Sequence, residues 1–312
     1  MAASLQEKLV NMENENHILR QKALSMNNLS APKTLSEESH EILLRRIKEN
    51  FGFKEGKPVA ACIIYKYLLE WRAFESERTA IFDHVIEAIN DVLKGTEADG
   101  ILPYWLSNTS ALLCLLQNNL QSNGLFTAPS RRSVGAQGLG GEIVQTLRSP
   151  SKLVGRSDGL PQVDARYPAI LFKQQLTACV EKIFEQLRDN LKKEISPLLS
   201  VCIQAPKTSG QRGNAFKSPG TRAQAPSNSN WDNIVNFLDL LMDTLRDNHV
   251  PSFFIRKLVT QLFSFINIQL FNSLLLRREI CTMSNGEYVK AGLSLLEKWI
   301  SNVTEEEHRG MS

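Results

Sequence analysis

Apolar residues recur with the spacing of an α-helix along almost every stretch of this sequence that is not rich in Ser, Gly or Pro. In 76–93, for example, Ile81, Val85, Ile89 and Val92 fall on one face of a helix. No stretch shows the sustained apolar–polar alternation of a half-buried β-strand, and no unit of fixed length repeats. The sequence therefore predicts an all-α fold, an irregular bundle of long helices. The expected helices are 40–51, 58–74, 76–93, 102–121, 168–195, 231–246, 251–276 and 287–302.

Two of these helices are apolar around most of their circumference. The stretch 58–74 begins with Pro58, a good first-turn residue, and continues VAACIIYKYLLEW, so we expect it at the centre of the bundle. The stretch 251–276 needs neighbours on nearly every side, because its apolar residues leave no wide polar face. If its neighbours are incomplete, the sequence predicts an exposed apolar patch there.

Two long interruptions, 124–166 and 204–230, lack helical spacing and are net basic, whereas the rest of the chain is mildly acidic. Loops of this length are usually functional or disordered, so we expect disordered basic insertions in the helical body. Ser133 follows two arginines, and Ser149 and Ser218 each precede a proline, which makes all three candidate phosphorylation sites. A phosphate would add nearly two negative charges to a basic loop. The alternative is an unmodified flexible loop.

The first 27 residues show a short heptad pattern. A dimer seam is predicted at two alternating heptad positions, with the polar Asn16 among otherwise mostly apolar side chains. Paired Asn side chains in such a seam fix register and favour two strands, whereas the alternative is a lone amphipathic helix. The predicted seam residues are Leu5, Leu9, Met12, Asn16, Leu19, Ala23 and Met26.

The sequence offers no recognisable catalytic, cofactor or metal site. Residues 52–58, GFKEGKP, have the wrong glycine spacing for a phosphate-binding loop, and Pro58 stands where that loop needs Ser or Thr, so we expect a turn before a helix. The five histidines are scattered, and the five cysteines form no CxxC pair, which suggests reduced, mostly buried thiols in a cytosolic protein. The basic loops hold too few aromatics for a nucleic-acid platform. No secretory signal or membrane span is expected.

Three segments together resemble a known family. They are GKPVAACIIYKYLLEWRAFESERTAIFDHVIEAIN at 56–90, LPYWLSNTSALLCLLQ at 102–117 and FNSLLLRREICTMSNGEYVKAGLSLLEKW at 271–299. They look like the dilute-type globular tail of class V myosins, and most closely that of plant class XI myosins. KLVNMENENHILRQKAL, near the start, is similar to the end of the coiled coil that leads into that tail. The resemblance runs from residue 1 to about residue 303.

The resemblance implies a fold and a role. The fold is an elongated helical bundle in two subdomains, and the role is to dock cargo receptors or Rab-type GTPases on vesicles and organelles. The partners implied are therefore those proteins and a second copy of the chain through the coiled coil. Actin would be reached only through a motor head that this sequence lacks, and membranes only through receptors. A non-motor scaffold carrying a dilute-type domain is the alternative.

The expected domain limits are a coiled-coil end at 1–27, a linker at 28–39, a globular tail at 40–303 and a divergent tail at 304–312. The family's tail continues beyond the segment that ends at Trp299, so we expect this one to be truncated, with its second subdomain incomplete. Cargo is expected on an exposed groove or face of the helical body. The expected surface is formed by the helices at 76–93 and 102–121, with Glu77 and Glu87 exposed on it.

Overall fold

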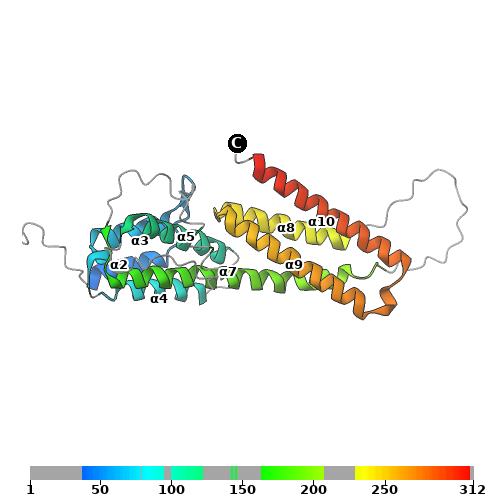
Figure 1. The fold of residues 1–312 in the computed structure, drawn as a ribbon, viewed down its shortest axis with the longest axis horizontal. Helices are drawn as coiled ribbons and strands as arrows, with labels where there is room; N and C mark the ends of the chain where they lie inside the picture. Colours follow the sequence, from blue (N-terminus) through cyan, green and yellow to red (C-terminus); the bar gives the residue numbers. More distant parts are fainter. Residues whose placement is uncertain are drawn as a thin grey trace, which may run out of the picture.

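The computed structural model describes residues 37–77, 79–94, 100–121, 163–206 and 229–309, together with Glu142 and Gln145. Its helices form an elongated bundle in which one long helix, α7, runs through both ends (Figure 1). α7 spans Tyr167–Cys202, and its 36 residues make it about 54 Å long at 1.5 Å per residue. Helices α4 and α5 pack against its first half, with α2 and α3 packed on them; α8 and α9 pack against its second half, and α10 packs on α8. The predicted all-α fold is confirmed, and the predicted coiled-coil and most of the linker lie outside the described residues.

The first group comprises α2 (Glu37–Ile47), α3 (Val59–Glu70), α4 (Ile81–Lys94) and α5 (Ile101–Asn119), with a 3-10 turn, η1, at Ala73–Glu75. Its central helix is α5, in which every residue from Leu102 to Leu116 is buried. The sequence placed 58–74 at the centre, and this prediction is wrong in part. α3 buries one side against α5 but exposes Cys62, Lys66 and Glu70. Long polar side chains on α3 need solvent, whereas the polar residues of α5 are small.

The buried Ser, Thr and Asn side chains of α5 all have partners. Thr109 and Ser110 donate to carbonyls one turn back, to Trp105 at 2.6 Å and to Leu106 at 2.5 Å. Asn108 reaches further: its Oδ1 accepts from the backbone N–H of Ala61 at 3.0 Å. That N–H belongs to the first turn of α3, where no earlier carbonyl of the helix is available to it. Asn108 therefore caps α3 from a neighbouring helix.

A short hairpin precedes α3. β1 (Phe53–Lys54) pairs antiparallel with β2 (Lys57–Pro58), and the two turn residues Glu55 and Gly56 both have positive φ, 51° and 73°. A two-residue hairpin turn of the primed type requires this conformation. The predicted turn is confirmed, but the short strands around it were not foreseen. Strands of two residues are too short to show an apolar–polar alternation in the sequence.

A second two-residue pairing corrects one predicted boundary. β3 (Leu120–Gln121), at the end of α5, pairs in parallel with β4 (Val163–Asp164). β4 lies inside the insertion expected to be disordered over 124–166, so the last residues of that insertion are ordered. Val163 is 7% exposed and joins the core, and the backbone N–H of Arg166 donates to the Phe74 carbonyl at 2.9 Å. One buried valine is too weak a signal to find from sequence.

The second group comprises α8 (Ser229–Asp247), α9 (Ser252–Leu276) and α10 (Met283–Arg309), with a 3-10 turn, η2, at Arg278–Ile280. α9 buries one stripe and leaves the opposite side of its second half open. This exposure was expected from its composition. α9 is also the one described helix long and apolar enough to cross a membrane, a criterion that core helices meet as well. Its most exposed apolar side chains are Ile268, Phe271, Leu275 and Leu276, at 55%, 60%, 64% and 82%.

Hydrogen bonds at two places tie the end of one helix to a neighbouring helix. At the corner between α8 and α9, the carbonyl of Asn248 accepts from Ser107 of α5 at 2.5 Å. The next residue, His249, has a φ of 47° and packs edge-on against Phe53 of the hairpin, with ring centroids 4.7 Å apart. At the far end of α7, Asn285 of α10 accepts from the Ala205 N–H at 2.8 Å and donates to the Ile203 carbonyl at 2.9 Å. The first contact links the two groups directly, and the second fixes α10 to the end of α7.

Candidate functional site

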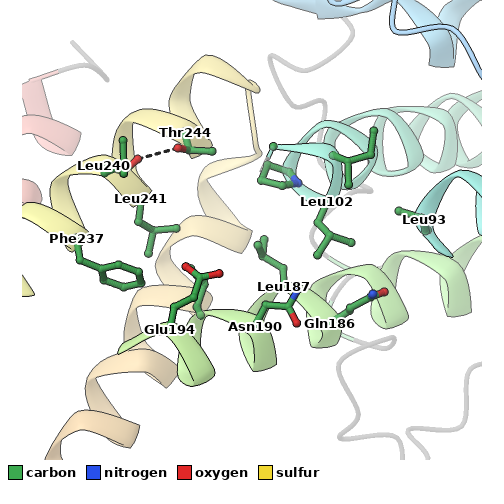
Figure 2. A pocket seen from close by; sticks show the side chains of 14 residues that line it. Leu93, Leu102, Gln186, Leu187, Asn190, Glu194, Phe237, Leu240, Leu241 and Thr244 are labelled. Carbon is green, nitrogen blue, oxygen red and sulfur yellow. Dashed lines mark hydrogen bonds between the residues drawn. The ribbon is translucent and has the colours of Figure 1, made fainter. Parts of the chain in front are cut away.

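A groove opens where the two helix groups meet along α7. It has a volume of about 340 Å³ and is bounded by the end of α4, the first turn of α5, the middle of α7 and one face of α8. Figure 2 shows Leu102 of α5, Leu187 of α7 and Leu241 of α8 converging on it. These three side chains are nearly buried, at 8%, 6% and 6% exposed. They form an apolar floor, and we call this feature the α5–α7–α8 groove.

The groove exists because α7 bridges the two groups where neither covers it fully. Leu187 and Leu191 are four residues apart, so both face the floor, while Gln186, Asn190 and Glu194 form a polar edge beside them. Across from that edge, α8 contributes Phe237, Leu240, Leu241 and Thr244. The rim residue Leu240 is 67% exposed.

The chemistry of the groove suits binding. Its lining holds a single ionisable side chain, Glu194, and the Thr244 hydroxyl donates to the Leu240 carbonyl at 2.8 Å (Figure 2). General acid–base or nucleophilic catalysis needs several reactive groups converging on one point. Among the described residues, no group of three or more His, Cys, Asp or Glu side chains lies close enough together to hold a metal ion. An apolar floor with a polar edge is instead typical of grooves that take an amphipathic helix.

A second groove lies on the other side of α8, against α10. Its volume is about 570 Å³, and Val235, Met242 and Leu295 contribute apolar lining. Asp239 accepts a 2.7 Å hydrogen bond from the indole N–H of Trp299, which closes the groove at its base. Asp239 thus holds α10 against α8, and we read this groove as part of the packing between the two helices.

The structure places the two residues that the sequence proposed for cargo binding outside the α5–α7–α8 groove. Glu87 lies on the exposed face of α4 and Glu77 in the turn before it, and neither lines the α5–α7–α8 groove. α5 is buried almost throughout, so it cannot offer the expected surface. Only its first turn, Ile101 to Pro103, reaches a groove. The proposed dimer seam, from Leu5 to Met26, and the phosphorylation sites Ser133, Ser149 and Ser218 lie outside the described residues.

Sequence reasoning missed the face of α8, although a signal was present. In the helix predicted at 231–246, one apolar stripe runs through Trp231, Val235, Leu238, Met242 and Leu245. Phe237, Leu240 and Leu241 fall off that stripe and were not used. Apolar residues on a second face of an otherwise amphipathic helix indicate a second contact surface.

Two of the buried cysteines are poor nucleophiles. Cys114, Cys179 and Cys202 are buried, as predicted for most of the thiols, and Cys62 and Cys281 are exposed. Burial raises the pKa of Cys179 to about 11, partly offset by Lys182, and raises the pKa of Cys202 to about 12. Both therefore stay protonated near neutral pH, and a protonated thiol is a poor nucleophile.

Comparison with known proteins identifies relatives of this chain. The DIL domain family matches residues 257–310, which cover most of α9 and all of α10. The chain is 72% identical to Protein OPAQUE1 of Zea mays, 61% identical to Myosin-15 of Arabidopsis thaliana and 49% identical to Myosin-11 of the same plant. These alignments cover 97%, 89% and 93% of the chain but only 23%, 18% and 20% of the relatives. The chain spans about a fifth of the length of these relatives, and it belongs to the plant class XI and class V myosin family as a DIL-bearing tail region.

Proposed function

We propose that this chain is the cargo-docking module of an actin-based transporter, and that a receptor segment binds in the α5–α7–α8 groove. The observation that carries the proposal is the half-open apolar groove, with Leu240 67% exposed at its rim. Isolated exposed leucines are ordinary on protein surfaces. Leu240 is different because it stands beside a hollow whose floor is already apolar. A ligand that covers it also covers Phe237 and fills the groove.

The groove favours an amphipathic helix as the receptor segment. Such a helix presents apolar side chains at spacings of three and four residues, which suit a floor made by helices. Its apolar side would contact Leu102, Leu187 and Leu241, and its polar side would meet the α7 edge. Glu194 is the ionisable residue of that edge, and its negative charge favours a receptor helix that carries Lys or Arg on that side. A rim charge of this kind tunes association rate and partner choice more than affinity.

The finer assignments rest on the family. We infer that the receptors sit on vesicles or organelles in the cytoplasm, that Rab-type GTPases are further partners, and that two copies associate through residues 1–27. We also infer a binding module without catalytic activity, because the matched regions belong to myosin tails. A non-motor scaffold remains the alternative, and its receptors would be junctional proteins. The α4 face around Glu87 is the alternative docking surface.

Vesicle capture tests the proposal with the full chain. The chain is immobilised and exposed to a vesicle fraction from plant cells, and bound vesicles are counted by a lipid dye. Leu240→Glu places a charge at the groove rim and should reduce capture at least tenfold. Leu275→Glu is the matched control, since Leu275 is 64% exposed but lies on α9, and it should leave capture unchanged.

Two results would overturn the groove assignment. Loss of capture by Leu275→Glu with retention by Leu240→Glu would place the docking surface on α9. Loss by Glu87→Lys alone would place it on α4. Circular dichroism spectra and melting curves of all variants must match the parent, so that altered capture reports binding. Failure of the parent chain to capture any vesicles would contradict the cargo-docking role itself.

A further inference from the structure

A smaller hollow lies between the hairpin and the exposed side of α3. It has a volume of about 260 Å³, and Val59, Cys62 and Ile63 form its apolar part. Lys54 and Lys57 of the hairpin and Lys66 of α3 surround it, and we call it the hairpin pocket. Its volume lies just below the ~300–1,000 Å³ typical of small-molecule pockets, so it accommodates one or two aliphatic side chains rather than a folded surface.

The walls of the hairpin pocket are held in place from behind. Phe53 of β1 lies between Tyr104 of α5 and His249 of the α8–α9 corner, with ring centroids 5.7 and 4.7 Å away. The first turn of α3 is fixed by the hydrogen bond from the Ala61 N–H to Asn108. The backbones that carry the lysines are therefore set before any ligand arrives, which reduces the ordering that binding requires.

The charge of the hairpin pocket is one-sided. Three lysines line it, and Glu55, at the tip of the turn, is the single acidic residue among its lining. Within the described part of the chain, none of the three lysines takes part in an ion pair. Three lysines with one nearby carboxylate leave a net positive charge, and an anionic ligand would be attracted to it. Partner selection by this pocket is therefore directed to negative charge.

We propose that the hairpin pocket binds an acidic linear segment of a partner protein, with one aliphatic side chain in the hollow and flanking carboxylates on Lys54, Lys57 and Lys66. The apolar floor requires the aliphatic side chain, and the lysines require the carboxylates. A membrane surface is the less suitable anionic partner, because it is flat and cannot fill a concave site. This second docking site is separate from the α5–α7–α8 groove and does not depend on it.

Cys62 makes the proposal measurable, because its thiol lies in the pocket and is exposed. Cys281, the other exposed thiol, lies after α9 and serves as the internal control. The probe is a synthetic peptide with two leucines flanked on each side by two acidic residues. Maleimide labelling of each cysteine is followed by mass spectrometry with and without peptide. We expect the peptide to slow labelling of Cys62 at least fivefold and to leave Cys281 unchanged.

Matched peptides and variants sharpen the test. A peptide with Gln and Asn in place of the acids, or with Gly in place of the leucines, should protect Cys62 less than twofold. Lys54→Glu with Lys66→Glu should abolish protection, whereas Lys193→Glu with Lys290→Glu, two exposed lysines elsewhere, should not. Lys57 is left intact because its charge lowers the pKa of Cys62, against the larger rise caused by burial. The labelling rates of Cys62 with and without peptide are therefore compared within each variant, and not between variants.

The outcomes separate the two docking sites and the two kinds of anion. Unchanged Cys62 labelling at millimolar acidic peptide overturns the proposal, as does equal protection by the neutral peptide. Protection by vesicles of phosphatidylserine and phosphatidylcholine, but not by the peptide, assigns the pocket to membranes and also overturns it. Leu240→Glu must leave peptide protection intact. Its effect on vesicle capture then reports on the groove alone.

Discussion

Gly292 of α10 lies directly against the indole ring of Trp231 of α8, and this contact predicts an unusually costly small substitution. A Cβ atom added at Gly292 would stand 2.1 Å from Cδ2 and Cε2 of that ring. Carbon atoms in contact are normally about 3.5–4.0 Å apart, so the ring or the helix must move by more than about 1 Å. Trp231 is fully buried, and the clash involves the fused body of its ring rather than a flexible end.

The expected magnitude combines two opposing effects of Gly292→Ala. Overpacking of a well-filled core destabilises by about 1–3 kcal/mol. Replacing Gly by Ala within a helix stabilises by about 0.5–1 kcal/mol, because glycine loses more freedom on folding. We therefore expect the free energy of unfolding to fall by up to about 2.5 kcal/mol. Because this contact joins α8 to α10, the substitution should weaken the packing between these two helices most.

Urea unfolding followed by circular dichroism measures the effect. Gly286→Ala is the matched control, since Gly286 lies in the same helix and an added Cβ there meets nothing within 4 Å. That variant should gain about 0.5–1 kcal/mol. Trp231→Phe should make Gly292→Ala less harmful than in the parent, because the smaller ring leaves room. A Gly292→Ala variant as stable as Gly286→Ala would refute the close packing of α8 on α10.

Four further predictions concern individual residues. Asn285→Ala should lower the free energy of unfolding by about 2 kcal/mol in urea titrations, because it leaves two backbone groups at the end of α7 unpaired. Burial raises the pKa of Cys179 and Cys202 in the folded state, so the folded protein binds these two protons more tightly than the unfolded chain does. Their contribution to the free energy of unfolding is complete below about pH 9 and is lost as the pH rises toward 11–12. The melting temperature should fall over that pH range, and it should fall less in the double Ala variant. Asn16→Ile should strengthen association of residues 1–27 while loosening the choice of oligomer, measured by sedimentation. Phe271→Glu, at an exposed position of α9, should reduce binding of a hydrophobic dye by the isolated chain, and unchanged dye fluorescence would show that the open side of α9 is not the binding patch.

Much of the helical architecture could be predicted because long amphipathic helices carry their own signal. The stretch 251–276 was expected as a helix and is observed as α9 at Ser252–Leu276. α7 runs seven residues past the predicted 195, through Pro197. A proline inside a helix removes one hydrogen bond and argues for a boundary. Here the buried Ile195 and Leu199 keep the helix on the core on both sides of it.

Long-range polar contacts explain what sequence alone could not supply. Asn108 and Asn285 each satisfy backbone groups of a helix far away in the chain, at separations of 47 and at least 80 residues. No spacing rule connects such pairs. The central position of α5 depends on the same kind of contact, because its Ser, Thr and Asn side chains are buried only where a partner exists. Hydropathy favoured 58–74 over α5 as the central helix, because it takes no account of the hydrogen-bond partners that small polar residues find inside the protein.

The docking surface was the least predictable feature, because a groove is made by several elements at once. Glu87 was chosen as an exposed residue on an amphipathic helix, and it is exposed. The groove, however, needs Leu102, Leu187 and Leu241, which come from three helices. Each of these leucines reads as an ordinary core residue in its own helix. Their meeting around an open hollow follows only from the way α7 joins the two helix groups.

The most direct test of the account is the affinity of a receptor segment for the α5–α7–α8 groove. A photoreactive amino acid at position 240 would identify the contacting segment from captured vesicles, and that segment would be made as a synthetic peptide. Its dissociation constant is then measured for the parent chain, Leu240→Glu and Leu275→Glu. Covering Leu240 contributes about 1.5–3 kcal/mol, and tenfold in affinity corresponds to about 1.4 kcal/mol. The account predicts at least tenfold weaker binding by Leu240→Glu and unchanged binding by Leu275→Glu, and equal affinities for all three chains would contradict it.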